Sequence, residues 1–141
     1  MNERTLLLVE DDPQAVSLVR AIFKKRKLQV TLAVASDGAE ALQYLTGDQT
    51  KREALPELPA MVLLDLDLPK VHGFEVLRSI RSHPRTQALP VIILTSSSSE
   101  TDATMGYTLG ANSFMRKPLK FEEFSRVLTS LRLELIAGKS N

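Results

Sequence analysis

Short apolar runs alternate with amphipathic segments along the chain. Runs made only of apolar residues are typical of strands that are buried on both faces of a parallel sheet. The segment 28–34 instead alternates apolar and polar residues, which indicates a strand at the edge of the sheet. The pattern predicts five strands, at residues 6–9, 28–34, 61–64, 90–94 and 112–116.

Amphipathic helices are predicted after each of these strands. Asp12 before Pro13 marks a helix start with Asp12 as its cap, and Ser99 or Thr101 marks a later one. Four basic residues at 24–27 suit the carboxyl end of the first helix. Five strand–helix units predict a doubly wound α/β fold with helices on both faces of one parallel sheet. The expected helices span residues 13–26, 38–45, 73–81, 100 or 102 to 109, and 120 onward.

One polar segment interrupts this alternation. Residues 46–59 hold Gly47, Pro56 and Pro59 together with a charged triplet, and we expect a loop there. A loop of that length is uncommon in a compact domain and is often functional. Because the chain shows neither an internal repeat nor a linker, its 141 residues are expected to form a single domain with a core at about 4–137.

Composition excludes several classes of protein. Hydrophobic residues make up 43% and charged residues 25%, which is ordinary for a folded soluble domain. The 18 Lys and Arg residues against 17 Asp and Glu residues leave a net charge of +1, which gives no support to a nucleic-acid binder. The chain has no cysteine, hence no disulfide and no thiol nucleophile. With neither a signal peptide nor an apolar run of membrane-spanning length, we expect a cytoplasmic protein without a membrane partner.

Acidic residues, a hydroxyl and an amine follow four of the five predicted strands. Ligands of open α/β sheets bind outside the carboxyl ends of the strands, so these side chains are expected to meet. Each has an ordinary explanation when taken alone, as a solvated loop residue or a strand end. Together, in register, they favour a functional site. The set consists of Glu10, Asp11, Asp65, Asp67, Thr95 and Lys117.

The residue types in this set suit phosphoryl transfer. Carboxylates that are held together repel one another, and a hard divalent cation relieves the repulsion. Ligation by a few oxygen atoms suits Mg²⁺. A carboxylate at the mouth of the site can act as a nucleophile and form an aspartyl phosphate. The amine of Lys117 can supply positive charge to the phosphoryl oxygens, and the hydroxyl of Thr95 can hydrogen-bond one of them.

Four segments of the chain resemble the receiver domain of two-component response regulators. The resemblance covers nearly the whole chain and rests on the order and spacing of the segments. It implies a flavodoxin-like fold with the strand order 2-1-3-4-5. The segments are LVEDDP around Glu10, LLDLDLP around Asp65, LTS around Thr95 and RKP around Lys117.

The resemblance implies that Asp65, Thr95 and Lys117 are catalytic and that four residues bind the metal ion. Asp65 is expected to accept the phosphoryl group from a sensor histidine kinase. Glu10, Asp11 and Asp65 are expected to bind Mg²⁺, with the backbone carbonyl of Asp67 as a further ligand. Lys117 is expected to pair with the phosphoryl group. No other enzymatic activity is implied, because a receiver catalyses only its own phosphorylation and dephosphorylation.

The resemblance also implies a conformational switch as the output of this stand-alone regulator. Thr95 is expected to turn its hydroxyl toward the phosphoryl group. Phe114 stands where the family places an aromatic residue that turns inward on activation. The changed surface is expected to be that of the fourth helix, the fifth strand and the fifth helix.

A narrower similarity is to phytochrome-associated single-domain response regulators. It rests on the long polar loop, on LPKVHG after Asp67 and on LTSS from Leu94. It implies a bacterial phytochrome as the kinase and a homodimer formed through the last strand and the last helix. Leu133 and Ile136 lie off the apolar stripe of that helix and suit such a contact.

Three alternatives stay open at the level of sequence. The chain can be a phosphorelay intermediate that passes the phosphoryl group onward, or a receiver that belongs to a longer DNA-binding regulator. The pair Asp65 and Asp67 also resembles the opening motif of haloacid-dehalogenase-type phosphatases. Against this last alternative, the metal-binding acids of that family lie downstream of the motif, whereas Glu10 and Asp11 lie upstream.

Overall fold

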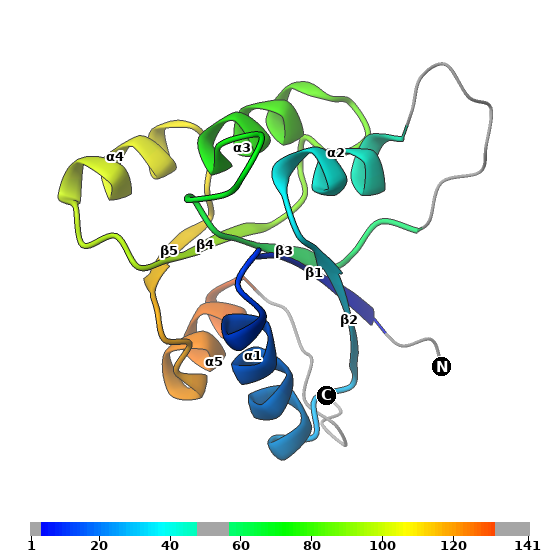
Figure 1. Ribbon diagram of the computed structural model, residues 1–141, viewed down its shortest axis with the longest axis vertical. Coiled ribbons are helices and arrows are strands. Elements are labelled where there is room, and N and C mark those ends of the chain that lie inside the picture. The colour runs from blue at the N-terminus through cyan, green and yellow to red at the C-terminus, as the bar shows by residue number, and fades with distance from the viewer. Residues whose placement is uncertain (1–3, 48–56, 132–141) are drawn as a thin grey trace.

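One parallel sheet with helices on both faces forms the fold in the computed structural model, which describes residues 4–47 and 57–131. The strand order is β2-β1-β3-β4-β5, with every pair parallel. In Figure 1, α2, α3 and α4 cover one face, and α1 and α5 cover the other. The predicted doubly wound fold and its strand order 2-1-3-4-5 are therefore confirmed. The strands are β1 (Arg4–Val9), β2 (Val30–Ala35), β3 (Met61–Leu64), β4 (Val91–Thr95) and β5 (Ser113–Arg116); the helices are α1 (Pro13–Lys25), α2 (Gly38–Thr46), α3 (Gly73–Ser82), α4 (Glu100–Thr108) and α5 (Phe121–Ser130).

Two apolar clusters, one on each face of the sheet, form the core. Successive residues of a strand point to opposite faces, so Leu7 packs toward α2 and α3 while Leu6 packs toward α1 and α5. Every residue of β3 and β4 is buried, whereas β2 at the edge is only partly buried. The continuous and the alternating apolar patterns thus predicted the central and edge strands correctly.

Several predicted strand boundaries are wrong by one or two residues. β4 is Val91–Thr95 rather than 90–94, β5 is Ser113–Arg116 rather than 112–116, and β2 ends at Ala35 rather than at 34. β1 begins at Arg4, two residues before the apolar run, because Arg4 pairs with Val30 on β2. β2 begins at Val30 rather than at Leu28. The amide of Leu28 donates to the carbonyl of Phe23 (3.1 Å), which makes Leu28 part of the turn that closes α1. Lys27 in that turn has a left-handed backbone, with a φ of 53°.

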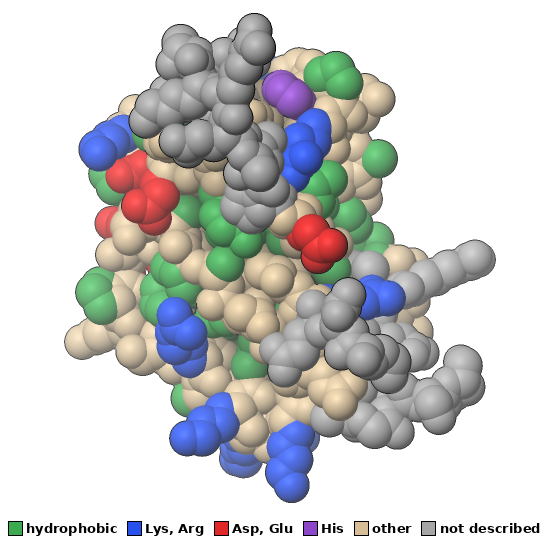
Figure 2. All heavy atoms as spheres, turned by 90° about the vertical axis from the view of Figure 1, so that its right-hand side faces the viewer, with side chains coloured by type: hydrophobic (Ala, Val, Ile, Leu, Met, Phe, Trp, Pro, Cys, Tyr) green, Lys and Arg blue, Asp and Glu red, His purple; other side chains and the backbone are tan. Residues whose placement is uncertain are grey.

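Capping side chains begin two of the helices as the sequence suggested. The carboxylate of Asp12 accepts a hydrogen bond from the amide of Gln14, and Ser99, rather than Thr101, caps α4. Lys24 and Lys25 occupy the last turn of α1, where positive charge is favourable beside the free carbonyls. Figure 2 shows Lys and Arg side chains gathered at the lower end of the molecule, where α1 ends. Asp37 caps α2, where its carboxylate accepts a hydrogen bond from the amide of Glu40 (2.8 Å).

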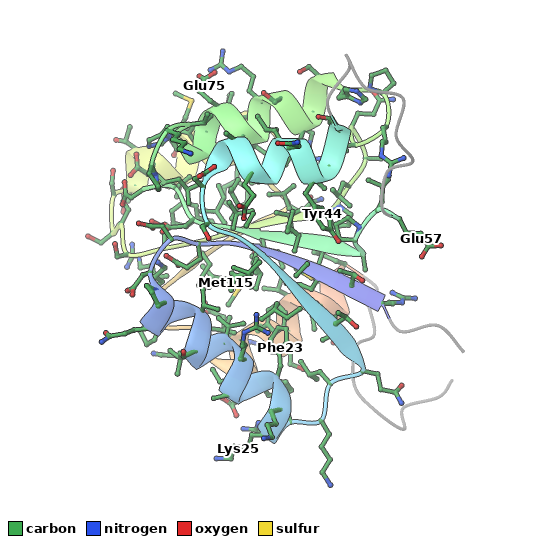
Figure 3. The ribbon with its side chains drawn as sticks, turned by 45° about the vertical axis from the view of Figure 1, so that its right-hand side comes forward. Phe23, Lys25, Tyr44, Glu57, Glu75 and Met115 are labelled. Carbon is green, nitrogen blue, oxygen red and sulfur yellow. The ribbon has the colours of Figure 1, made fainter. Side chains whose placement is uncertain are left out.

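The two helices beneath the sheet are joined by aromatic contacts. The rings of Phe23 and Phe124 stack with centroids 5.6 Å apart and an interplanar angle of 17°. The Arg26 guanidinium lies 4.5 Å from the centre of the Phe121 ring and forms an ion pair with Glu122 (3.0 Å). In Figure 3, Phe23 lies between α1 and the sheet. This side of the molecule is therefore firmly packed.

Part of the predicted loop and the end of the chain lie outside the described residues. Within 46–59, Thr46 ends α2 and residues 57–60 precede β3, while 48–56 are not described. Leu133 and Ile136, expected at a dimer contact, also fall outside. Among the described helices, none is long and apolar enough to cross a membrane.

Replacement of Phe124 is expected to weaken the fold. Phe124 is fully buried, so Phe124→Ala removes its stacking partner from Phe23 and leaves a cavity. We expect the free energy of unfolding in urea, followed by circular dichroism, to fall by about 3–5 kcal/mol. Phe121→Ala on the same helix is the control, because Phe121 is only half-buried and the loss should be smaller. Equal losses in the two variants would contradict this packing.

Candidate functional site

Buried polar side chains gather at the carboxyl edge of the sheet. Among the described residues, four polar or charged ones are buried, and Glu10, Asp65 and Thr95 lie at this edge with 3%, 5% and 0% exposure. Val9 of β1 lies beside Leu64 of β3 in the register, so the residues that follow them emerge side by side. The amide of Asp65 donates to the carbonyl of Val9 (3.1 Å), which fixes this arrangement.

Lys117 joins the acidic residues from the far end of the sheet. Its Nζ lies 2.5 Å from Oε1 of Glu10 and 3.1 Å from Oδ2 of Asp65. The amide of Lys117 donates to the carbonyl of Thr95 (2.8 Å), which holds the residue at the end of β5. Buried charges are tolerated when they are paired in this way. The structure therefore brings together residues that follow three different strands.

The pKa values of the site reflect both burial and mutual charge. Burial raises the pKa of the Glu10 carboxyl, and the charge of Asp65 adds to the rise. Hydrogen bonds from Lys117 and from the amide of Asp12 offset only part of it. Burial by itself lowers the pKa of Lys117, but its hydrogen bonds and attraction to Glu10 and Asp65 outweigh burial and raise that pKa. Lys117 is consequently a cation at neutral pH.

Three carboxylates are arranged in a way that suits a divalent cation. Glu10, Asp11 and Asp65 can each offer one oxygen, and these oxygens lie within 4.8 Å of one another. Asp11 is exposed, so the group opens to solvent on one side. Three negative charges face the single ammonium of Lys117, which leaves negative charge unbalanced. Oxygen ligands with this charge fit Mg²⁺ or Mn²⁺.

The loop between β3 and α3 is held directly against Asp65. The amide of Asp67 donates to Oδ1 of Asp65 (3.3 Å), while the Asp67 side chain is exposed. Gly73 was predicted only as a helix start. A Cβ there would lie 2.5 Å from the carbonyl oxygen of Asp65 and 2.6 Å from Cα of Leu66, so only glycine permits this approach. The feature of the sequence that could have indicated this close contact is a glycine a few residues after Asp65 and Asp67.

His72 has a local role that the sequence reasoning missed. The side chain of His72 is exposed. Its Nδ1 also accepts a hydrogen bond from the amide of Phe74 (3.0 Å), so His72 caps α3. His83 is half-buried, and its Nδ1 accepts a hydrogen bond from the amide of Arg85 (3.1 Å).

Thr95 and Phe114 lie on neighbouring strands beneath α4. The hydroxyl of Thr95 accepts a hydrogen bond from the amide of Ser97 (3.3 Å). Phe114 is half-buried and packs against the core cluster on the α4 side of the sheet. It also lines a groove of about 530 Å³ together with Ala103 of α4 and Lys117. Phe114 therefore touches both the core and an open surface beside the site.

Comparison with known proteins identifies the family. Residues 6–129 match the response regulator receiver domain. The chain belongs to this family. A receiver accepts a phosphoryl group on an aspartate, and the acidic cluster at the sheet edge fits the divalent cation that this chemistry uses. The match supports the prediction of a receiver domain over the alternative of a haloacid-dehalogenase-type phosphatase. The receiver family is not a known enzyme family.

The relatives include regulators of the phytochrome class. The chain is 38% identical to the probable methanogenesis regulatory protein FilR2 of Methanothrix harundinacea, over 90% of this chain and 80% of that protein. It is 32% identical to the response regulator Rcp1 of Synechocystis sp., over 91% of this chain and 86% of that protein. The structure of the bacteriophytochrome response regulator AtBRR superposes with a TM-score of 0.85 and 37% identity, over 99% of this chain and all of that one (100%). The similarity to phytochrome-associated regulators is thus confirmed.

Removal of the Lys117 charge is expected to destabilise this receiver. Lys117→Met leaves the buried carboxylates of Glu10 and Asp65 without their cation. We expect the free energy of unfolding in urea with EDTA present to fall by about 3–5 kcal/mol. Lys120→Met serves as the control, since Lys120 is exposed and should change stability little. A Lys117→Met protein as stable as the control would show that the ion pairs are not needed for the fold.

Proposed function

We propose that Asp65 is the aspartate that accepts the phosphoryl group, and that the donor is the phosphohistidine of a sensor histidine kinase. The observation that carries this proposal is the Lys117 ammonium, bound at once to Asp65 and Glu10 at the mouth of the sheet. An oxygen of Asp65 attacks the phosphorus, the phosphorus–nitrogen bond breaks, and its electron pair leaves with the imidazole. Lys117 then turns from the carboxylate to a phosphoryl oxygen.

The proposed metal ligands are the carboxylates of Glu10, Asp11 and Asp65 and the backbone carbonyl of Asp67. The closeness of the three carboxylates supports this assignment, and so does the loop that holds Asp67 beside Asp65. When bound, Mg²⁺ supplies positive charge to the phosphoryl oxygens. Thr95 and Lys117 are the other proposed catalytic residues, and the activity of the receiver is limited to its own phosphorylation and dephosphorylation.

The proposed output is a shift between two conformations. Thr95 donates its hydroxyl to the phosphoryl group, and Phe114 moves inward from its half-buried position. The change reaches the surface formed by α4, β5 and α5, where the groove beside Phe114 lies. Phosphorylation acts by stabilising one of two existing states.

The proposed kinase is a bacterial phytochrome, and the proposed place of action is the cytoplasm, where the ATP used by such kinases is found. Similarity to the bacteriophytochrome response regulators AtBRR and RtBRR, at 37% and 38% identity, supports this partner. The proposed assembly is a homodimer through β5, α5 and the segment after it.

Phosphorylation is tested with acetyl phosphate and Mg²⁺, followed by intact mass. We expect one phosphoryl adduct on the wild type and none on Asp65→Asn, since the amide is not a nucleophile. Asp12→Asn is the matched control. It removes a neighbouring carboxylate while keeping the helix cap, so it should be labelled like the wild type.

An adduct of equal yield on Asp65→Asn would refute the assignment of Asp65. The same reaction with EDTA in place of Mg²⁺ should label the wild type far less, because the phosphoryl oxygens then lack the cation. Equal labelling with the chelator would refute the metal ligands while leaving Asp65 in place.

The homodimer is tested by size-exclusion chromatography with light scattering. We expect the wild type to have the mass of two chains and the double variant Leu133→Ser, Ile136→Ser to have the mass of one, because the exchange removes the apolar side chains proposed for the contact. Replacing Leu18, which is exposed on α1, by Ser provides a control on another face. A monomeric wild type, both before and after phosphorylation, would contradict the dimer.

A further inference from the structure

α4 is anchored at its ends rather than along its length. Gly106 is its one buried residue, while Met105 and Tyr107 are exposed at 41% and 52%. At the carboxyl end, the Arg81 side chain donates to the carbonyl of Gly110 (2.9 Å). In Figure 1, α4 lies at the outer side of its layer, beyond α3. With little apolar area buried along the helix, the end contacts decide where it sits.

The amino end of α4 is held by a ring of side-chain hydrogen bonds. Oγ of Ser97 donates to Oδ2 of Asp102 (2.7 Å), and both residues are half-buried. Oγ of Ser97 also accepts from the amide of Ser99 (3.2 Å), and Oγ of Ser99 accepts from the amide of Asp102 (3.2 Å). An acid at this helix position commonly bonds back to the amide of the capping residue. Here the Asp102 carboxylate accepts from Ser97 instead, so a hydrogen bond joins the first turn of α4 to the preceding loop.

Ser97 also contacts the hydroxyl of Thr95. The amide of Ser97 donates to Oγ1 of Thr95 (3.3 Å), and the Thr95 side chain is completely buried. Moving this hydroxyl to another staggered rotamer takes the oxygen away from the Ser97 amide. Ser97 is itself tied to Asp102 and cannot follow. The orientation of Thr95 and the position of α4 are therefore linked through one residue.

We propose that Ser97 and Asp102 are positioning residues that form a latch, which holds Thr95 in its resting orientation and so weakens the response to phosphorylation. This inference rests on the proposed role of Thr95 as the hydroxyl that binds the phosphoryl group. While the latch is closed, turning Thr95 costs the hydrogen bond from Ser97. Breaking the contact between Ser97 and Asp102 frees the loop to follow Thr95 and releases the amino end of α4.

The latch is tested with beryllofluoride and Mg²⁺, a non-covalent mimic of the phosphoryl group, titrated and followed by fluorine NMR. We expect Ser97→Ala and Asp102→Ala to bind it about threefold to tenfold more tightly than the wild type, the range that one lost hydrogen bond corresponds to. Asp102→Asn keeps an acceptor for Ser97 and should return to the wild-type affinity. Ser98→Ala is the matched control, because the Ser98 hydroxyl bonds to no other described residue.

Further outcomes decide between a latch and a merely structural contact, and between failure of the latch and failure of the proposed function. The double variant Ser97→Ala, Asp102→Ala should bind like either single variant, since both break the same bond, and additive effects would overturn the proposal. Variants that bind no more tightly than the wild type, while urea unfolding shows them folded, would also overturn it. Faster amide hydrogen exchange at residues 97–103 in Ser97→Ala is expected without any ligand. A wild type that binds no beryllofluoride would overturn both the proposed function of Asp65 and the latch. Binding by the wild type, with the same affinity in the variants, would overturn the latch alone.

Discussion

The ion pairs of Lys117 with Glu10 and Asp65 are the interaction on which this site depends. Two buried carboxylates follow neighbouring strands, and the cation that balances them follows β5, with β4 in between. Burial of such charges is tolerated only when they are paired. The side chain of Lys117 therefore reaches past β4, and the charged groups meet at the carboxyl edge of the sheet, where Thr95 is also buried.

The single ammonium of Lys117 does not balance all the carboxylates of the site. Asp11 adds a third carboxylate at the open side, and the raised pKa of Glu10 reflects burial among these charges. A divalent cation would supply positive charge to the carboxylates. A phosphoryl group would supply an anion that Lys117 can bind. The repulsion between the carboxylates is unfavourable in the free protein. The same grouping of charges suits the site to phosphoryl transfer.

The two faces of the sheet differ in how firmly their helices are packed. On one face, the stacked rings of Phe23 and Phe124 join α1 to α5. On the other, α4 buries only Gly106 and is held at its two ends. Elements that move during signalling come from the less stable parts of a structure. The switch proposed for Thr95 therefore involves the helix that is packed less firmly.

The amino-acid sequence by itself determined the elements, the fold class and the candidate site. Apolar periodicity separates central strands from the edge strand, and parallel strands bring the residues that follow them to one edge, so Glu10, Asp65 and Lys117 were predictable together. The starts of β1 and β2, by contrast, depend on the pairing of Arg4 with Val30. The ion pair of Lys117 with Asp65 joins residues 52 positions apart. The link from Ser97 to Asp102 depends on which acceptor a hydroxyl finds once the loop is folded. Such contacts are decided only by the tertiary structure, because residue type states what a side chain can bind but not which partner comes within reach.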